Sequence, residues 1–327
     1  MSERPKFDFK TQYTGNLKWL EKGIVNLTIH GSHAYGMARP ESDVDVRGIC
    51  VPPKEYFLGF ASTFEQAEQK GDPDLVIYDI RKFFNLASKC NPNVLEIINT
   101  APSDWIVTTP TFEKLYENRH LFLSKAARWS YAGYAFAQLK RIKNHRGWIL
   151  NPPKKKPVRS DFGLPDAQKL NASDVGAVEF LIANSEEYSE LPGQLMALVN
   201  KEKAYKAALG EWNSYENWKA TRNKARFELE EKHHYDTKHA AHLVRLMRTC
   251  REVLVDHTIN VHRPDAEELK AVRNGAWTYD RLIEWAEEQE TLLDALYETS
   301  TLPHKPDVKK LDALCMELVE MHWKNNP

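Results

Sequence analysis

The hydrophobic pattern of the chain changes near residue 110, and this change constrains the fold most. Before it, short segments rich in β-branched residues or alternating in polarity are bounded by Gly, Pro or Asp, as β-strands are. The predicted strands are 24–29, 43–51, 63–69 and 74–80. Gly71-Asp72-Pro73 separates the last two, which is typical of a hairpin.

Helical periodicity begins after Arg81 and dominates beyond about residue 110, with a loop at 151–165. We therefore predict an α+β protein. Residues 1–110 form a mixed sheet with helices, and residues 111–327 form a mostly α-helical domain that carries a basic loop.

Composition excludes several classes of protein. The 327 residues are 42% hydrophobic and 28% charged, which suffices for a packed core and argues against disorder. The apolar runs are shorter than the ~18 residues that a membrane span needs. The N-terminus lacks an apolar signal region, and the four Cys residues are scattered, so we expect a cytoplasmic protein.

The most informative motif joins a Gly-Ser turn to a pair of carboxylates. A predicted strand runs into Gly31-Ser32, where a glycine allows close approach of the backbone and exposed N–H groups can bind phosphate. Asp43 and Asp45 follow, two apart on the next predicted strand, so both carboxylates point to one face. Two such carboxylates repel each other unless a cation lies between them.

These oxygen ligands suit Mg2+, which binds one or two carboxylates together with substrate phosphates. A phosphate-binding turn beside a metal site is what phosphoryl or nucleotidyl transfer requires. A D-x-D pair by itself is a weak signal, and most such pairs are solvated. The joint pattern from Gly31 to Asp45 is far more specific.

This joint pattern resembles the signature of the DNA polymerase β-like nucleotidyltransferase superfamily. Three further blocks, in the same order, resemble its RNA-repair-associated branch of predicted nucleotidyltransferases. They are the run 78–84 with Asn91-Pro92-Asn93, the run 235–246, and Arg263-Pro264 with Arg273-Asn274-Gly275. The resemblance implies a polymerase β palm-like catalytic domain over residues 1–110 and a helical, substrate-binding domain after it. It also implies two bound ions, Mg2+ or Mn2+.

The superfamily usually has a third carboxylate on a later strand. Asp74 and Asp79 are the candidates, and their spacing places them on opposite faces of a regular strand. The family pattern favours Asp74 as a metal ligand with Asp43 and Asp45, with Asp79 as the alternative. Asp74 could instead simply close its turn.

A predicted helix from Asp236 to about Val255 carries a cationic stripe. At 100° per residue, Lys238, His242 and Arg245 share one side. We predict that these three residues bind the phosphates of a nucleotide together with Gly31 and Ser32. The alternative is a solvated face.

A second cationic feature lies between Asn118 and Ser160, where there is no Asp or Glu. Aromatic residues are interleaved with its basic residues, a pattern that can neutralise phosphates and stack bases. The basic residues are Arg119, Lys125, Arg128, Lys140, Arg141, Lys143, Arg146, Lys154, Lys155, Lys156 and Arg159. We predict that region 119–159 contacts an RNA acceptor, although pairing with acids elsewhere would also explain it. The net charge of -1 requires any such contact to be local.

Together these features predict a Mg2+-dependent nucleotidyltransferase. It would move a nucleoside monophosphate from an NTP to an acceptor hydroxyl, in RNA by our interpretation, and release pyrophosphate. The alternative is a non-catalytic nucleotide- or RNA-binding protein that retains the fold.

Overall fold

The computed structural model describes residues 5–165, 174, 176, 191–221 and 224–326. The chain divides into two compact units. Unit 1 comprises Met1–Lys143 and Asp236–Pro327, and unit 2 comprises Asn144–Tyr235. The helical segment after residue 235 is therefore part of the same unit as the sheet. The boundary at residue 110, which separates two functional domains by our interpretation, stays a prediction.

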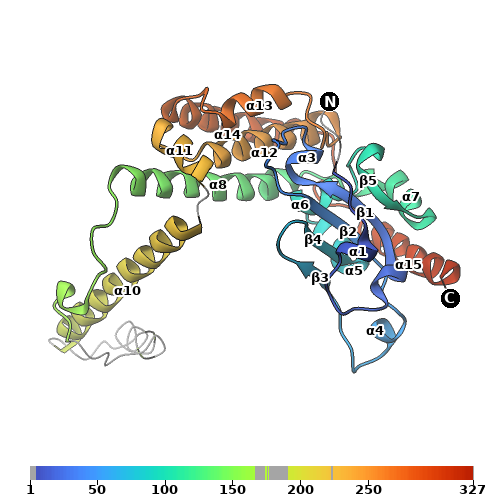
Figure 1. The fold of residues 1–327 in the computed structure, drawn as a ribbon, viewed down its shortest axis with the longest axis horizontal. Helices are drawn as coiled ribbons and strands as arrows, with labels where there is room; N and C mark the ends of the chain where they lie inside the picture. The colour runs from blue at the N-terminus through green and yellow to red at the C-terminus, as the bar shows by residue number, and fades with distance from the viewer. Residues whose placement is uncertain (1–4, 166–173, 175, 177–190, 222–223, 327) are drawn as a thin grey trace. The chain divides into compact units, whose positions relative to one another are not determined.

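Unit 1 is built on a five-stranded mixed sheet with the strand order β3-β4-β2-β1-β5 (Figure 1). The strands are β1 (Ile24–His30), β2 (Asp45–Cys50), β3 (Gln66–Gln69), β4 (Asp74–Asp79) and β5 (Trp105–Thr108). β2 and β4 pair in parallel, and the other pairs are antiparallel. The four predicted strands are present, and the α+β fold class is confirmed. β5 was not predicted.

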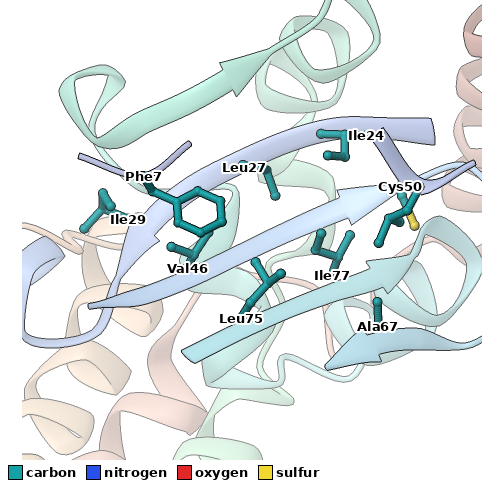
Figure 2. Close-up of a cluster of buried hydrophobic side chains, with 10 residues drawn as sticks. Phe7, Ile24, Leu27, Ile29, Val46, Cys50, Ala67, Leu75 and Ile77 are labelled. Carbon is teal, nitrogen blue, oxygen red and sulfur yellow. The ribbon is translucent and has the colours of Figure 1, made fainter. Parts of the chain in front are cut away.

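One face of the sheet is apolar. Leu27 of β1, Val46 of β2 and Leu75 of β4 lie in one buried cluster, which Phe7 also joins (Figure 2). β4 alternates between buried and half-buried residues, as a strand between two different environments does. Val46 and Cys50 of β2 and Leu75 and Ile77 of β4 therefore face this core, and their polar neighbours Asp45 and Asp74 face the opposite side.

Helices cover the sheet and continue the chain after it. Short helices precede or connect the strands: α1 (Phe9–Gln12), α2 (Leu20–Gly23), α3 (Gly31–Ala34) and α4 (Glu55–Leu58). Longer or later elements of unit 1 are α5 (Ile80–Ala87), α6 (Pro92–Ile97), η1 (Pro102–Asp104), α7 (Pro110–Glu117), η2 (Arg119–Phe122), α12 (Thr237–Asp256), α13 (Ala266–Arg273), α14 (Tyr279–Thr299) and α15 (Val308–Asn325). α12 packs against α13 and α14, and α15 packs against α5 and α7.

Among its described residues, unit 2 contains helices and a basic loop. It contains the end of α8 (Ala127–Leu150), η3 (Arg159–Phe162), α10 (Leu191–Thr221) and α11 (Lys224–His233). Trp148 of α8 packs against Tyr215 and Trp218 of α10. At the loop, Arg159 donates two hydrogen bonds of 2.9 Å to the carboxylate of Glu202. These contacts fix the loop to α10.

Candidate active site

A row of polar side chains crosses three neighbouring strands at one edge of unit 1. In the strand register, His30 of β1 lies opposite Asp45 of β2, and Asp45 lies beside Asp74 of β4. Residues paired in this way point to the same face of a sheet. Asp43 is exposed and lies just before β2, which begins at Asp45. The structure therefore brings Asp45 and Asp74 together and places Asp43 near them.

Asp45 is the electrostatic centre of this row. Burial raises the pKa of its carboxyl group, and the neighbouring carboxylates of Asp74 and Asp43 raise it further. Arg47 and Lys238 oppose this shift of the Asp45 pKa. A carboxylate among other carboxylates is an unfavourable arrangement in an isolated protein and a favourable one around a cation.

Gly31 provides the space for Asp45. Gly31 has φ +61°, and a Cβ placed on it would lie 2.0 Å from Oδ2 of Asp45. No side chain fits at that distance, and the left-handed backbone also favours glycine. The chain forms the single helical turn α3 from Gly31, where the sequence predicted a Gly-Ser turn after the strand. Gly31 and Ser32 are thus half-buried beside the carboxylates.

Arg47 is a member of the site that the sequence analysis missed. Its Nη2 lies 3.2 Å from Oδ1 of Asp45, and its Nη1 lies 3.3 Å from Oδ1 of Asp74. Arg47 follows Asp45 by two residues on β2, so it shares the polar face. This spacing was the signal available in the sequence.

Asp79 lies at the other end of β4, away from Asp45. It caps helix α5 by accepting a hydrogen bond from the backbone N–H of Arg81, and it forms a 2.7 Å ion pair with the Arg81 side chain. Its side chain is buried. The structure thus places Asp74 beside Asp45 and gives Asp79 a capping role.

Helix α12 contributes the predicted cationic residues in two different ways. Lys238 is exposed and lies near enough to Asp45 to influence its pKa. His242 is half-buried, and burial, then Arg245, Lys238, His239 and Arg273, hold its pKa well below the ordinary value. His242 is therefore a neutral imidazole among cations at neutral pH.

Arg245 is buried instead of facing a solvent-accessible site. Its Nη1 donates to the buried carboxylate of Glu96, and its guanidinium lies 3.9 Å from the ring centre of Tyr35. Tyr35 donates a 2.6 Å hydrogen bond to the same carboxylate. This network joins α12 to α6 and to the turn after β1. The location of Arg245 does not favour phosphate binding, because its charge is already balanced by Glu96.

The turn that follows β1 is held by residues from the C-terminal part of unit 1. Backbone N–H of Arg263 donates to the carbonyl of Tyr35 at 3.3 Å, and Nη1 of Arg273 donates to the carbonyl of Met37 at 3.3 Å. The Arg39 side chain donates to Asn274. Sequence blocks more than 200 residues apart thus meet around the Gly31–Ser42 segment.

The basic region 119–159 divides into paired and unpaired cations. Lys125 and Arg128 are buried, and Arg128 forms a 2.8 Å ion pair with Asp294. These two residues stabilise the fold and are unsuited to binding RNA. Lys155 pairs with Asp161, and Arg159 pairs with Glu202. Exposed members whose side chains have no contact among the described residues are Lys140, Arg141, Lys143, Lys154 and Lys156.

Two comparisons relate the chain to known proteins. Residues 12–151 match the RNA repair pathway DNA polymerase beta family. An uncharacterized 38.9 kDa protein from the nrdC-mobD intergenic region of Enterobacteria phage T4 is 31% identical over 120 residues. That alignment covers 33% of this chain and 35% of the phage protein. The chain thus spans about a third of the length of this relative.

Proposed function

Because residues 12–151 match the RNA repair pathway DNA polymerase beta family, we propose that this protein is a nucleotidyltransferase. It transfers a nucleoside monophosphate from an NTP to the hydroxyl group of an acceptor and releases pyrophosphate. RNA is the acceptor in this proposal. The whole protein's substrate and partners are likewise proposals, because the matched segment is only part of the chain.

The observation that carries the proposal is the pairing of Asp45 with Asp74 beside Gly31. The two carboxylates repel each other, and the pKa of Asp45 is raised by burial and by its acidic neighbours. This repulsion persists unless a cation balances the two carboxylates, and the guanidinium of Arg47 between them marks a place where positive charge is favourable.

The donor set fits Mg2+ or Mn2+. All three candidate ligands, Asp43, Asp45 and Asp74, supply the oxygen atoms that these ions prefer. Bound in a pair, such ions activate an attacking oxygen and stabilise the leaving phosphate oxygens. The role of the three aspartates in this proposal is to hold the ions and to orient the triphosphate against them.

Gly31, Ser32, Lys238 and His242 are the proposed contacts for the triphosphate. Gly31 borders Asp45 and Ser32 follows it in the chain, while Lys238 supplies an exposed positive charge in the electrostatic range of Asp45. His242 supplies a neutral donor, since its pKa is well below the ordinary value. Arg245 belongs to the supporting network, where it fixes Tyr35 and thereby the turn.

RNA would contact the exposed cations of α8 and of the basic loop. Five of the eleven basic residues of region 119–159 remain available for phosphate groups: Lys140, Arg141, Lys143, Lys154 and Lys156. Such contacts bind the backbone without reading the base sequence.

We place this activity in the cytoplasm. The four cysteines are free, three of them buried, which agrees with a reducing compartment. Among the helices described, none is both long and apolar enough to cross a membrane.

The direct test is transfer of label from each α-labelled NTP in the presence of Mg2+, with and without single-stranded RNA. We expect labelled RNA and an equal amount of pyrophosphate from the wild-type protein. Asp45→Asn and Asp74→Asn should each lower the rate by at least about 100-fold, which corresponds to roughly 3 kcal/mol of lost transition-state stabilisation. Circular dichroism should show that both variants fold.

Asp79→Asn is the matched control on the same strand. It keeps a side-chain oxygen that can cap α5 but loses the ion pair with Arg81, so it should lower the melting temperature and leave the rate per folded molecule unchanged. Nucleotide binding without release of pyrophosphate would instead support the non-catalytic alternative. Full activity of both Asp45→Asn and Asp74→Asn would refute the site.

A further inference from the structure

We propose that the guanidinium group of Arg47 acts as an internal counter-cation between Asp45 and Asp74, and that a divalent metal ion has to displace it to bind there. The inference rests on the proposed function for the nature of that ion. It adds that a residue of the same chain bridges the two carboxylates that the ion would bind.

The geometry of Arg47 supports the first half of this inference. Nη2 donates to Oδ1 of Asp45 at 3.2 Å, while Nη1 lies 3.3 Å from Oδ1 of Asp74. One guanidinium thus bridges two carboxylates that are register partners on neighbouring strands. Arg47 therefore balances these two carboxylates as a bound cation would.

The second half follows from the use of the carboxylate oxygens. A metal ion shared by Oδ1 of Asp45 and Oδ1 of Asp74 would compete with Arg47 for these two atoms, because both now accept hydrogen bonds from its guanidinium group. It would also lie close to a fixed positive charge, which is unfavourable in a partly buried site. The metal ion and the guanidinium therefore compete for the same pair of carboxylates.

Displacement would not leave Arg47 without partners. Its Nη1 also donates to the carbonyl of Val46 at 3.0 Å and to the carbonyl of Asp74 at 2.8 Å. These backbone acceptors belong to β2 and β4 and do not depend on the carboxylates. Arg47 can release both aspartates and keep two hydrogen bonds, so the exchange needs only a small change in its side chain.

The test is a titration of the protein with Mn2+ alone. The electron paramagnetic resonance signal of the free ion measures how much Mn2+ is bound. Arg47→Met removes the competing guanidinium group and its hydrogen bonds to the two carboxylates. Because hydrogen bonds to charged groups contribute substantially to the free energy, we expect Mn2+ to bind about tenfold more tightly to this variant. Arg47→Lys keeps the positive charge but loses the planar guanidinium group whose two nitrogens contact both carboxylates. We therefore expect a smaller gain in Mn2+ affinity, about threefold. This variant keeps the proposal testable if Arg47→Met does not fold.

Arg81→Met is the matched control. Arg81 also pairs with an aspartate of β4, but at the far end of the strand, so Mn2+ affinity should stay at the wild-type value. Equal or weaker Mn2+ binding by Arg47→Met and Arg47→Lys would overturn the proposal and show that Arg47 only organises the carboxylates.

The two proposals fail in different ways. Tighter Mn2+ binding by Arg47→Met in a protein that transfers no nucleotide would refute the proposed function and retain the counter-cation. Nucleotide transfer with unchanged Mn2+ affinity would do the reverse. Absence of Mn2+ binding in every variant would overturn both.

Discussion

At the scale of single residues, Gly31 and Asp45 show how the backbone can determine the chemistry of a side chain. The carboxylate of Asp45 occupies the space in which a Cβ on residue 31 would lie. Any other residue at position 31 would push this carboxylate out of line with Asp74. The glycine of the motif is therefore required by Asp45 as much as by a phosphate group.

We predict that Gly31→Ala abolishes Mn2+ binding and nucleotide transfer. The methyl group would lie 2.0 Å from Oδ2 of Asp45, which has to move. The left-handed backbone, with φ +61°, adds a destabilisation of roughly 1–2 kcal/mol. Thermal denaturation measures the stability, and Mn2+ titration measures the site.

Gly36→Ala separates these two effects. Gly36 also has a positive φ, +72°, but its Cβ would meet the His262 side chain at 3.0 Å and not a carboxylate. A similar loss of stability with retained Mn2+ binding is expected for Gly36→Ala. If Gly31→Ala bound Mn2+ like the wild type, the close approach to Asp45 would have no functional meaning.

Residue types and spacing predicted the carboxylates better than they predicted the arginines. Alternation along a strand separated Asp74 from Asp79, and the family pattern favoured Asp74, which the structure pairs with Asp45. Asp43 lies before β2, so alternation does not set the direction of its side chain. Arg245 was expected to face a nucleotide because it shares a helical stripe with Lys238. Periodicity cannot separate a solvated polar stripe from a buried one, and the partner Glu96 lies 149 residues away in the chain.

At the scale of elements, the network of His30, Tyr35, Glu96 and Arg245 connects β1, the turn after it, α6 and α12. Each of these side chains is buried. A buried charge pair is costly unless its hydrogen bonds are made, so this network fixes how α12 sits on the sheet. Lys238 reaches Asp45 from that helix.

Stability should fall below neutral pH because of His30. Burial lowers the pKa of His30 to about 4. Glu96 opposes this shift, and Arg47 and Arg245 lower the pKa further. Between about pH 6.5 and pH 4 the unfolded chain binds a proton that the folded protein does not, so stability falls as the pH falls through this window. The contribution is roughly 3 kcal/mol, and His30→Gln should remove it. Urea denaturation at pH 7.5 and pH 4.5 measures the difference.

The exposed His120 provides the control for this pH dependence. In His120→Gln, the unfolding free energy should fall between pH 7.5 and pH 4.5 by the same amount as in the wild-type protein. The lowered pKa values of His242 and His322 contribute their own pH dependence, which both variants keep. An equal fall in wild type and His30→Gln would show that His30 is not neutral in the folded protein.

The strands of the sheet followed from the sequence, with the exception of β5. β5 has only four residues, Trp105–Thr108, and no alternation of polarity that could identify a strand. It exists because β1 offers an edge: Leu27 pairs with Val107, and Asn26 donates from its side chain to the same residue's carbonyl. Long-range pairing of this kind leaves no local pattern.

At the scale of the whole molecule, charge is unevenly distributed in a chain of net charge -1. The structure explains part of the basic region by internal ion pairs, such as Arg128 with Asp294 and Arg159 with Glu202. The sequence could not show which cations were paired, because the acids lie far away along the chain. The cations that remain exposed occur in both compact units, on α8 in unit 1 and on the loop of unit 2.

If these exposed cations bind RNA, their number determines the salt dependence of binding. Each phosphate contact to a single strand contributes about 0.7 to the slope of log affinity against log salt concentration. Lys140→Ala with Lys143→Ala should lower this slope by about 1.4, and so should Lys154→Ala with Lys156→Ala. Fluorescence anisotropy with a labelled single-stranded RNA, at several salt concentrations, measures the slope for each double variant. Lys305→Ala with Lys309→Ala, two exposed lysines outside the region, is the matched control and should leave the slope unchanged. If neither double variant within region 119–159 changed the slope, the region would not bind RNA. Its lysines would then be solvated surface charges.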